Sequence, residues 1–160
     1  MQATTILVIS DTHRRLGAAQ WLLETKRPDY CIHLGDMLAD CQALERQFPM
    51  QKLLYVLGNN DSLLRGQGCP LEFTATIAGK RLFLCHGHTL YVKAGLSRLT
   101  ARAKEEHADM VLYGHTHLPC LQNDSGLLIL NPGTVGTYGW VVITGEKIHA
   151  SIERVKEHGI

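Results

Sequence analysis

The chain has 160 residues, a length that suits one domain with a substantial hydrophobic core. Hydrophobic residues make up 45% of it, charged residues 19%, and the formal net charge is +1. This balance excludes a strong electrostatic field for binding nucleic acid or an anionic membrane, and the sequence predicts a single domain over residues 1–160.

No stretch of the sequence approaches the roughly 18 apolar residues of a membrane span. Residues 1–5 show neither a basic segment nor a cleavage-site pattern, so a secretory signal is not expected. The five cysteines form no CxxC pair, which argues against a disulfide framework and against a thiolate zinc site. We therefore expect a cytoplasmic protein.

The first half of the chain alternates between strand and helix patterns. Apolar runs at residues 4–10, 29–34 and 52–57 predict buried strands. Helical patterns at residues 17–26 and 39–48 lie between them, and each is followed by a proline. This β-α-β-α-β order predicts parallel strands joined by right-handed crossovers.

The second half is richer in strands. After a predicted loop at residues 62–70, residues 73–77 and 81–85 form a candidate hairpin. A basic helix is predicted at residues 95–107 and a buried strand at 110–113. Four further strand candidates, which together look like an antiparallel meander, cover residues 118–122, 127–130, 138–144 and 147–154.

Two architectures fit this α/β order of elements. The strands can form two sheets packed face to face with helices outside, or a single parallel sheet with an antiparallel edge. In either case the polar residues that follow the parallel strands lie at their carboxyl ends, where open α/β sheets place their ligand sites.

Seven side chains that can bind metal come directly after the apolar runs, in a fixed order. They are Asp11, His13, Asp36, Asn59, His86, His115 and His117. Five predicted strand ends therefore deliver only carboxylate, amide and imidazole groups, which suit divalent cations. The set is large enough for two ions about 3.5–4 Å apart, a spacing that can clamp the oxygens of a displacement reaction.

Each motif also has an ordinary structural explanation. Asp11 could cap the following helix, and Asp36 and Asn59 could be turn residues beside glycines. The His-x-His pairs His86/His88 and His115/His117 are harder to explain in this way, because buried imidazoles need hydrogen-bond partners. The other histidines are interpreted as ordinary packed or surface residues: His33, His107, His149 and His158.

The motif order DxH, GD, GNxD, HGH and GHTH resembles that of the calcineurin-like metallophosphoesterases. The short length and the segment Asn131-Pro132-Gly133-Thr134 look like the small, single-domain phosphodiesterase branch of that family. The resemblance implies a four-layer α/β/β/α sandwich, in which two mixed sheets pack face to face with helices outside. It also implies two divalent metal ions, with manganese as the first choice and nickel, zinc or iron as alternatives.

The resemblance further divides the seven side chains between two metal positions. The first ion would be bound by Asp11, His13, Asp36 and His117. The second would be bound by Asp36, Asn59, His86 and His115. Asp36 is thus the expected bridge between the two ions.

Two positions depart from the family pattern. Many members have a histidine where this chain has Asn60, and that histidine protonates the leaving group or steadies the phosphate. The resemblance therefore does not imply that Asn60 acts as a general acid, a role that contributes about 10²–10⁴-fold to the rate where it is present. Small-branch members often have glycine at the position of Arg14, which could bind a substrate phosphate or narrow the mouth of the site. Asn60 and His88 are the candidates for contacts to substrate oxygens.

The leading hypothesis is hydrolysis of a small phosphodiester by a hydroxide that bridges two metal ions. The alternatives are a phosphomonoesterase and a catalytically inactive scaffold, similar to a eukaryotic retromer subunit that has lost part of this ligand set. The present chain keeps all seven positions, which favours the enzyme. Similar small members form dimers or tetramers, so a homo-oligomer is expected, with no nucleic-acid or membrane partner.

Overall fold

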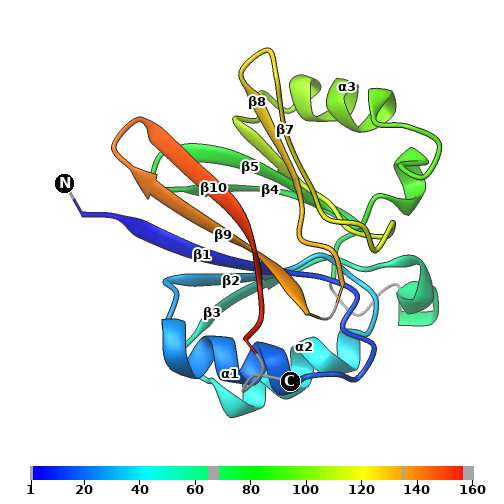
Figure 1. Cartoon of the computed structure of the whole chain (residues 1–160). Helices are drawn as coiled ribbons and strands as arrows, with labels where there is room; N and C mark the ends of the chain where they lie inside the picture. Colours follow the sequence, from blue (N-terminus) through cyan, green and yellow to red (C-terminus); the bar gives the residue numbers. More distant parts are fainter. Residues whose placement is uncertain (1, 65–68, 135, 157–160) are drawn as a thin grey trace.

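The computed structural model describes residues 2–64, 69–134 and 136–156, apart from the side chains of residues 62–64. Within these ranges, ten strands form two five-stranded sheets (Figure 1). In spatial order, the first sheet contains β10 (Lys147–Arg154), β9 (Thr137–Thr144), β1 (Thr4–Ile9), β2 (Tyr30–His33) and β3 (Lys52–Tyr55). The second contains β4 (Glu72–Ile77), β5 (Lys80–Cys85), β6 (Met110–Leu112), β8 (Leu127–Asn131) and β7 (Cys120–Asp124).

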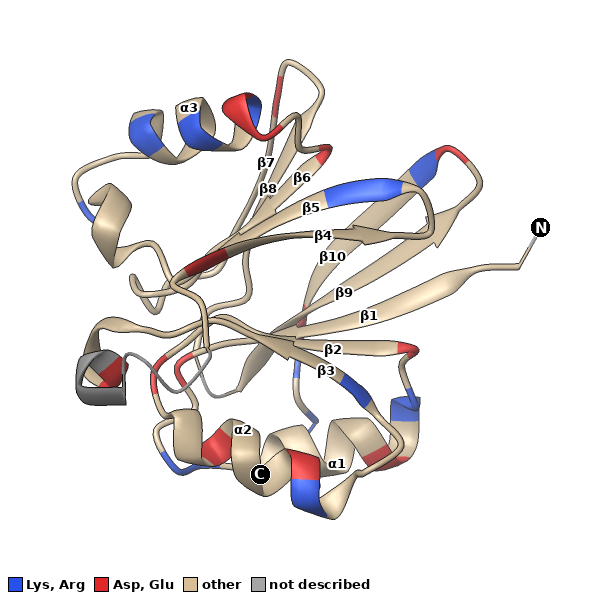
Figure 2. Cartoon of the chain, turned by 180° about the vertical axis from the view of Figure 1, so that it is seen from behind, with Lys and Arg blue, Asp and Glu red and all other residues tan. Residues whose placement is uncertain are grey.

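The helices cover the outer faces of the two sheets. Helices α1 (Gly17–Lys26) and α2 (Leu38–Gln47) lie against the first sheet, and α3 (Ser97–Glu105) lies against the second (Figure 1). Two short 3₁₀ helices, η1 (Asn59–Leu64) and η2 (His88–Leu90), follow β3 and β5. Lysine and arginine are interspersed with aspartate and glutamate along both helical layers (Figure 2). None of the helices in the described ranges is both long and apolar enough to cross a membrane.

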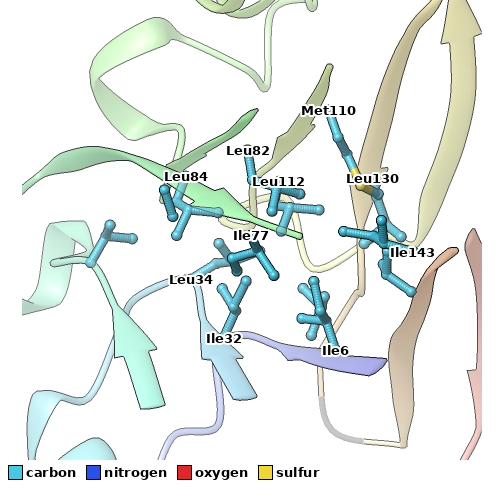
Figure 3. Packing of buried hydrophobic residues seen from close by; sticks show 14 residues of the cluster. Ile6, Ile32, Leu34, Ile77, Leu82, Leu84, Met110, Leu112, Leu130 and Ile143 are labelled. Carbon is cyan, nitrogen blue, oxygen red and sulfur yellow. The ribbon is translucent and has the colours of Figure 1, made fainter. Parts of the chain in front are cut away.

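The alternation of side chains along β1 explains the layers. Ile6 and Val8 point into a core between the two sheets, whereas Leu7 and Ile9 pack on the opposite face with Leu22 of α1. Because both faces of β1 are buried, the strand reads as a continuous apolar run. Figure 3 shows side chains of both sheets meeting in the inter-sheet core. The expected α/β/β/α sandwich is therefore present.

The parallel order predicted for the first half is confirmed, since β2 pairs in parallel with both β1 and β3. The single meander predicted for the tail is wrong. The β7–β8 hairpin joins the second sheet through a parallel pairing of β8 with β6, and the β9–β10 hairpin joins the first sheet through an antiparallel pairing of β9 with β1. The chain passes from the second sheet to the first between β8 and β9. Leu130 of β8 and Val141 of β9 both pack in the inter-sheet core.

The loop predicted at residues 62–70 differs in part from the structure. Its first residues belong to η1, which extends to Leu64, and residues 65–68 lie outside the described ranges. The predicted strand at residues 118–122 begins two residues later, at Cys120. These shifts leave the order of elements unchanged.

Candidate metal centre

The seven candidate ligands lie at the carboxyl ends of strands from both sheets. The first sheet supplies Asp11 and His13 after β1, Asp36 after β2 and Asn59 after β3. The second sheet supplies His86 after β5 and both His115 and His117 after β6. Hydrogen-bond and ion-pair distances of 3.0–3.9 Å connect these side chains, so the structure brings all seven together.

Asp11 is fully buried and uses its two oxygens differently. Its Oδ2 accepts hydrogen bonds from the Ser10 hydroxyl at 2.5 Å and the His115 backbone N–H at 3.2 Å. Its Oδ1 faces the Nε2 atoms of His117 at 3.1 Å, His86 at 3.8 Å and His13 at 3.9 Å. One oxygen is therefore fixed by donors, while the other is presented to three imidazole rings.

Asp36 is almost completely buried between two sets of groups. Asn60 donates its backbone N–H to Oδ1 at 3.0 Å and its side-chain amide to Oδ2 at 2.8 Å. Oδ1 also lies 3.5 Å from His86 Nε2, and Oδ2 lies 3.9 Å from His13 Nε2. Burial by itself raises the pKa of Asp36, but the Asn60 hydrogen bonds and the two histidines outweigh it and lower the pKa below its usual value. The carboxylate is thus held in its charged form.

His86 is fully buried, and its hydrogen bonds define which ring nitrogen carries the proton. Nδ1 lies 2.7 Å from the carbonyl oxygen of Leu34, which can only accept, so Nδ1 is the donor. In the neutral ring Nε2 is then bare. It faces three oxygens, those of Asn59 at 3.0 Å, Asp36 at 3.5 Å and Asp11 at 3.8 Å. This convergence of lone pairs in a buried position fits a cation, and a ring N–H held by a carbonyl is the usual second contact of a metal-binding histidine.

His115 extends the cluster toward solvent. Its Nδ1 lies 3.1 Å from Asn59 Oδ1, and its ring centroid lies 5.0 Å from that of His86. Burial lowers the pKa of His115, and nearby His86, Lys93 and His88 lower it further. The neutral ring that results can donate a lone pair to a metal.

Among the residues that the structure describes, two groups of side chains have ligand atoms within 4.8 Å of one another. One contains Asp11, His13 and His117, and the other contains Asp11, Asp36 and His86. Asp11 belongs to both groups, and Asp36 also spans them, because its two oxygens face His86 and His13 separately. Each group could therefore hold a metal ion, and the two groups are connected through the carboxylates of Asp11 and Asp36.

Glycines allow the strand ends to approach this closely. A Cβ on Gly58 would overlap the Asp36 carboxylate, and one on Gly35 would lie 2.7 Å from His86 Nδ1 and 2.8 Å from the Gly58 nitrogen. Real Cβ atoms do not make such contacts, so both positions exclude a side chain. The GD and GNxD motifs thus have a steric basis in addition to their polar residues.

The backbone that carries the candidate ligands is strained. Five of the seven have left-handed φ values, at Asp11 (53°), His13 (44°), Asp36 (63°), His115 (69°) and His117 (63°). Such conformations cost on the order of 1–3 kcal/mol each in non-glycine residues, and they persist only where the surrounding structure fixes them.

Asp61 supplies part of that support, and the sequence did not single it out. Its Oδ2 accepts the backbone N–H groups of Asp36 and Gly58, both at 2.9 Å. Its Oδ1 accepts those of Met37, the N-cap residue, at 2.9 Å and of Leu38, the first residue of α2, at 3.0 Å. Asp61 therefore caps α2 from a distant segment and fixes the turn that carries Asp36. Its place in the GNxD motif was the available signal.

The remaining candidates lie around the centre. The Asn60 side-chain amide is engaged by Asp36, as described above. His88 is half-buried, with its ring centroid 5.4 Å from that of His86 and 6.1 Å from that of His115. Arg14 is exposed, and its backbone N–H donates to Asp40 Oδ2 at 2.8 Å.

This combination of fold and centre defines the metallophosphoesterase class. The chain belongs to the calcineurin-like phosphoesterase superfamily, whose domain description matches residues 5–149.

Named relatives agree with this class. The chain is 30% identical over 131 residues to the probable metallophosphoesterase MJ0623 of Methanocaldococcus jannaschii, a match that covers 79% of this chain and 66% of that one. It is 29% identical over 151 residues to phosphodiesterase YfcE of Escherichia coli K12, covering 81% of this chain and 78% of YfcE. Among solved structures, vacuolar protein sorting 29 of Cryptosporidium parvum aligns with a TM-score of 0.81 over 97% of this chain and 93% of that one. Its identity is 19%, so this likeness is one of fold alone.

Proposed function

We propose that this protein hydrolyses phosphodiesters with the help of two divalent metal ions. The observation that carries the proposal is the position of the buried His86 Nε2, which faces oxygens of Asp11, Asp36 and Asn59 while Nδ1 contacts the Leu34 carbonyl oxygen. Membership of the family supports phosphoester hydrolysis, and a relative named as a phosphodiesterase supports a diester substrate. A phosphomonoester remains the alternative substrate.

The proposed ligands are those expected from the sequence. Asp11, His13, Asp36 and His117 would bind one ion, and Asp36, Asn59, His86 and His115 the other. The two oxygens of Asp36, facing His13 and His86, support its role as the bridge. Asp11 is a second candidate for a shared ligand, because Oδ1 faces imidazoles of both groups.

Two bound divalent ions would supply Lewis-acid chemistry and an activated water nucleophile at this centre. Asn60 holds Asp36 through two hydrogen bonds and keeps its carboxylate charged. His88, half-buried beside His86 and His115, is the proposed contact to a phosphoryl oxygen. Because Asn60 stands where many family members have a histidine that can protonate the leaving group, substrates whose leaving groups need little protonation should react best.

Several finer features stay predictions. They are manganese as the metal, a cytoplasmic location, a homo-oligomer and a single domain over residues 1–160.

The test is hydrolysis of bis(p-nitrophenyl) phosphate by protein reconstituted with Mn²⁺ or Ni²⁺, beside p-nitrophenyl phosphate as the monoester. We expect turnover of the diester and its loss in Asp36→Asn, with the metal content of each sample measured. His149→Gln, which changes an exposed histidine on β10, is the matched control and should keep wild-type activity. Protein shown to carry two metals that turns over neither ester would contradict the proposal and favour a binding scaffold.

A further inference from the structure

A second buried polar cluster lies behind the candidate metal centre. It consists of Thr12 in the loop after β1, His33 at the end of β2 and Asp40 in the first turn of α2. Their exposed fractions are 5%, 0% and 4%. Buried polar groups are retained where their hydrogen bonds are satisfied, so the cluster needs a structural explanation. None of the three is among the candidate metal ligands.

The hydrogen bonds of the cluster run in one direction. The Gly35 backbone N–H donates to His33 Nδ1 at 3.1 Å, so Nδ1 is an acceptor and the neutral ring carries its proton on Nε2. Burial, opposed by nearby carboxylates, lowers the pKa of His33 to about 4, which keeps the ring neutral. His33 Nε2–H then donates to Thr12 Oγ1 at 2.9 Å, and the Thr12 hydroxyl donates to Asp40 Oδ2 at 2.5 Å.

Asp40 also closes the loop on the other side of His13. The same Oδ2 atom accepts the backbone N–H of Arg14 at 2.8 Å. Thr12 and Arg14 flank His13 in the sequence, so one carboxylate oxygen holds both neighbours of a candidate ligand. An ordinary acidic residue in the first turn of a helix needs only the helix dipole as a partner. Asp40 Oδ2 instead makes two contacts with the loop that carries His13.

This restraint acts where the backbone requires it. His13 and Arg14 have φ values of 44° and 68°, so two consecutive non-glycine residues adopt the left-handed conformation. The His13 side chain is 38% exposed, and its Nε2 lies 3.9 Å from both Asp11 and Asp36. Its direction therefore depends chiefly on the backbone, and the Asp40 contacts hold that backbone.

We propose that Asp40, Thr12 and His33 form a positioning network that fixes the His13 loop for metal binding. The inference rests on the proposed function, because it assumes that His13 binds a metal ion. Asp40 holds the residues on both sides of His13, whereas His33 also accepts the Gly35 backbone N–H beside Asp36. Loss of the Thr12 and Asp40 contacts should therefore weaken chiefly the metal position that uses His13.

The experiment is calorimetric titration of metal-free protein with Mn²⁺. The metal position whose Kd rises in His13→Ala is the position that uses His13. Thr12→Val, which replaces the hydroxyl with a methyl group of similar size, should raise the Kd of that position about 10–100-fold. The Kd of the other position should rise less than that of the His13 position, because it shares Asp36 with that position but does not use His13.

Two matched pairs separate hydrogen bonding from packing. Thr12→Ser keeps the hydroxyl and should retain wild-type affinity, in contrast to Thr12→Val. Asp40→Asn keeps one acceptor oxygen, which suffices for both contacts to Oδ2, and should bind metal better than Asp40→Ala. The Asp40 pair provides the test if Thr12→Val fails to fold, as judged by circular dichroism and thermal unfolding.

The outcomes distinguish the two proposals. Wild-type protein that binds neither Mn²⁺ nor, in parallel titrations, Ni²⁺, Zn²⁺ or Fe²⁺ would overturn both the metal-dependent function and the network. Wild-type protein that binds two ions, with equal affinities in Thr12→Val and Thr12→Ser, would overturn the network alone. Equal weakening of both metal positions would show a general structural role and would also overturn it.

Discussion

The Asp61 carboxylate offers the sharpest test of how the centre is built. It accepts four backbone N–H groups, from Asp36, Met37, Leu38 and Gly58. Asp61→Ala leaves these amides without their acceptor in a region where Asp61 itself is 3% exposed. At about 1 kcal/mol of net stabilisation per hydrogen bond, the variant should lose about 4 kcal/mol of unfolding free energy.

Such a loss is large beside the roughly 5–15 kcal/mol that stabilises a typical domain. For a chain of this length it corresponds to a Tm lower by about 8–16 °C. Urea denaturation and thermal unfolding of the metal-free protein measure the change without a contribution from ligand binding. Metal-free conditions matter, because the variant also displaces the turn that carries Asp36.

Two variants calibrate the result. Asp61→Asn keeps one acceptor oxygen and two of the four hydrogen bonds, while its NH₂ group faces the other two donors, so its stability should lie between the extremes. Asp124→Ala removes a half-exposed aspartate paired with Lys104 at 3.6 Å, and should change the unfolding free energy by no more than about 0.5 kcal/mol. A loss below about 1 kcal/mol in Asp61→Ala would refute the assigned role.

Three further predictions concern pH, metal and packing. Burial lowers the pKa of His33 from 6.5 to about 4, so the unfolded chain binds a proton at this residue more readily than the folded chain does. The unfolding free energy should therefore be unaffected by His33 above about pH 6.5 and should fall by up to about 3 kcal/mol as the pH drops toward 4. Urea denaturation across this range should show a shallower loss in His33→Gln than in wild type, whereas His149→Gln should follow wild type. Adding Mn²⁺ at 100 times the Kd of a metal position should stabilise the wild type by about 2.7 kcal/mol for each position filled to that level, seen as a higher Tm that chelation reverses and Asp36→Asn abolishes. Gly58→Ala should abolish the same metal-induced Tm shift, because its Cβ overlaps the Asp36 carboxylate; an unchanged shift would show that the strand ends can separate.

Most of the fold could be predicted because the central strands, such as β1 and β6, are buried on both faces. Leu7 and Val8 lie in different cores, and the continuous apolar run around them shows this without any homologous sequence. The tail could not be assigned correctly, since a hairpin pattern does not specify which sheet the hairpin joins. The pairings of β8 with β6 and of β9 with β1 depend on inter-sheet contacts of residues such as Leu130 and Val141.

The candidate ligands could be found because chemistry and position coincide at the strand ends. The residues that support them could not. Asp61 and Asp40 act through hydrogen bonds to backbone groups 23–26 positions away and to the Thr12 hydroxyl 28 positions away, apart from the local contact to Gly58. His33 was interpreted as an ordinary packed histidine, and the structure adds its bonds to Thr12 and Gly35. No single-sequence pattern reveals such pairs or the left-handed φ values they stabilise.

The groups that surround His86 Nε2 come from both halves of the sandwich: Asp11, Asp36 and Asn59 follow strands of one sheet, and His86 follows a strand of the other. An ion bound there is a cross-link between two separately hydrogen-bonded layers. Metal occupancy of this position would therefore depend on the packing of the two sheets against each other. A partly folded chain in which only one sheet has formed would release its metal ion.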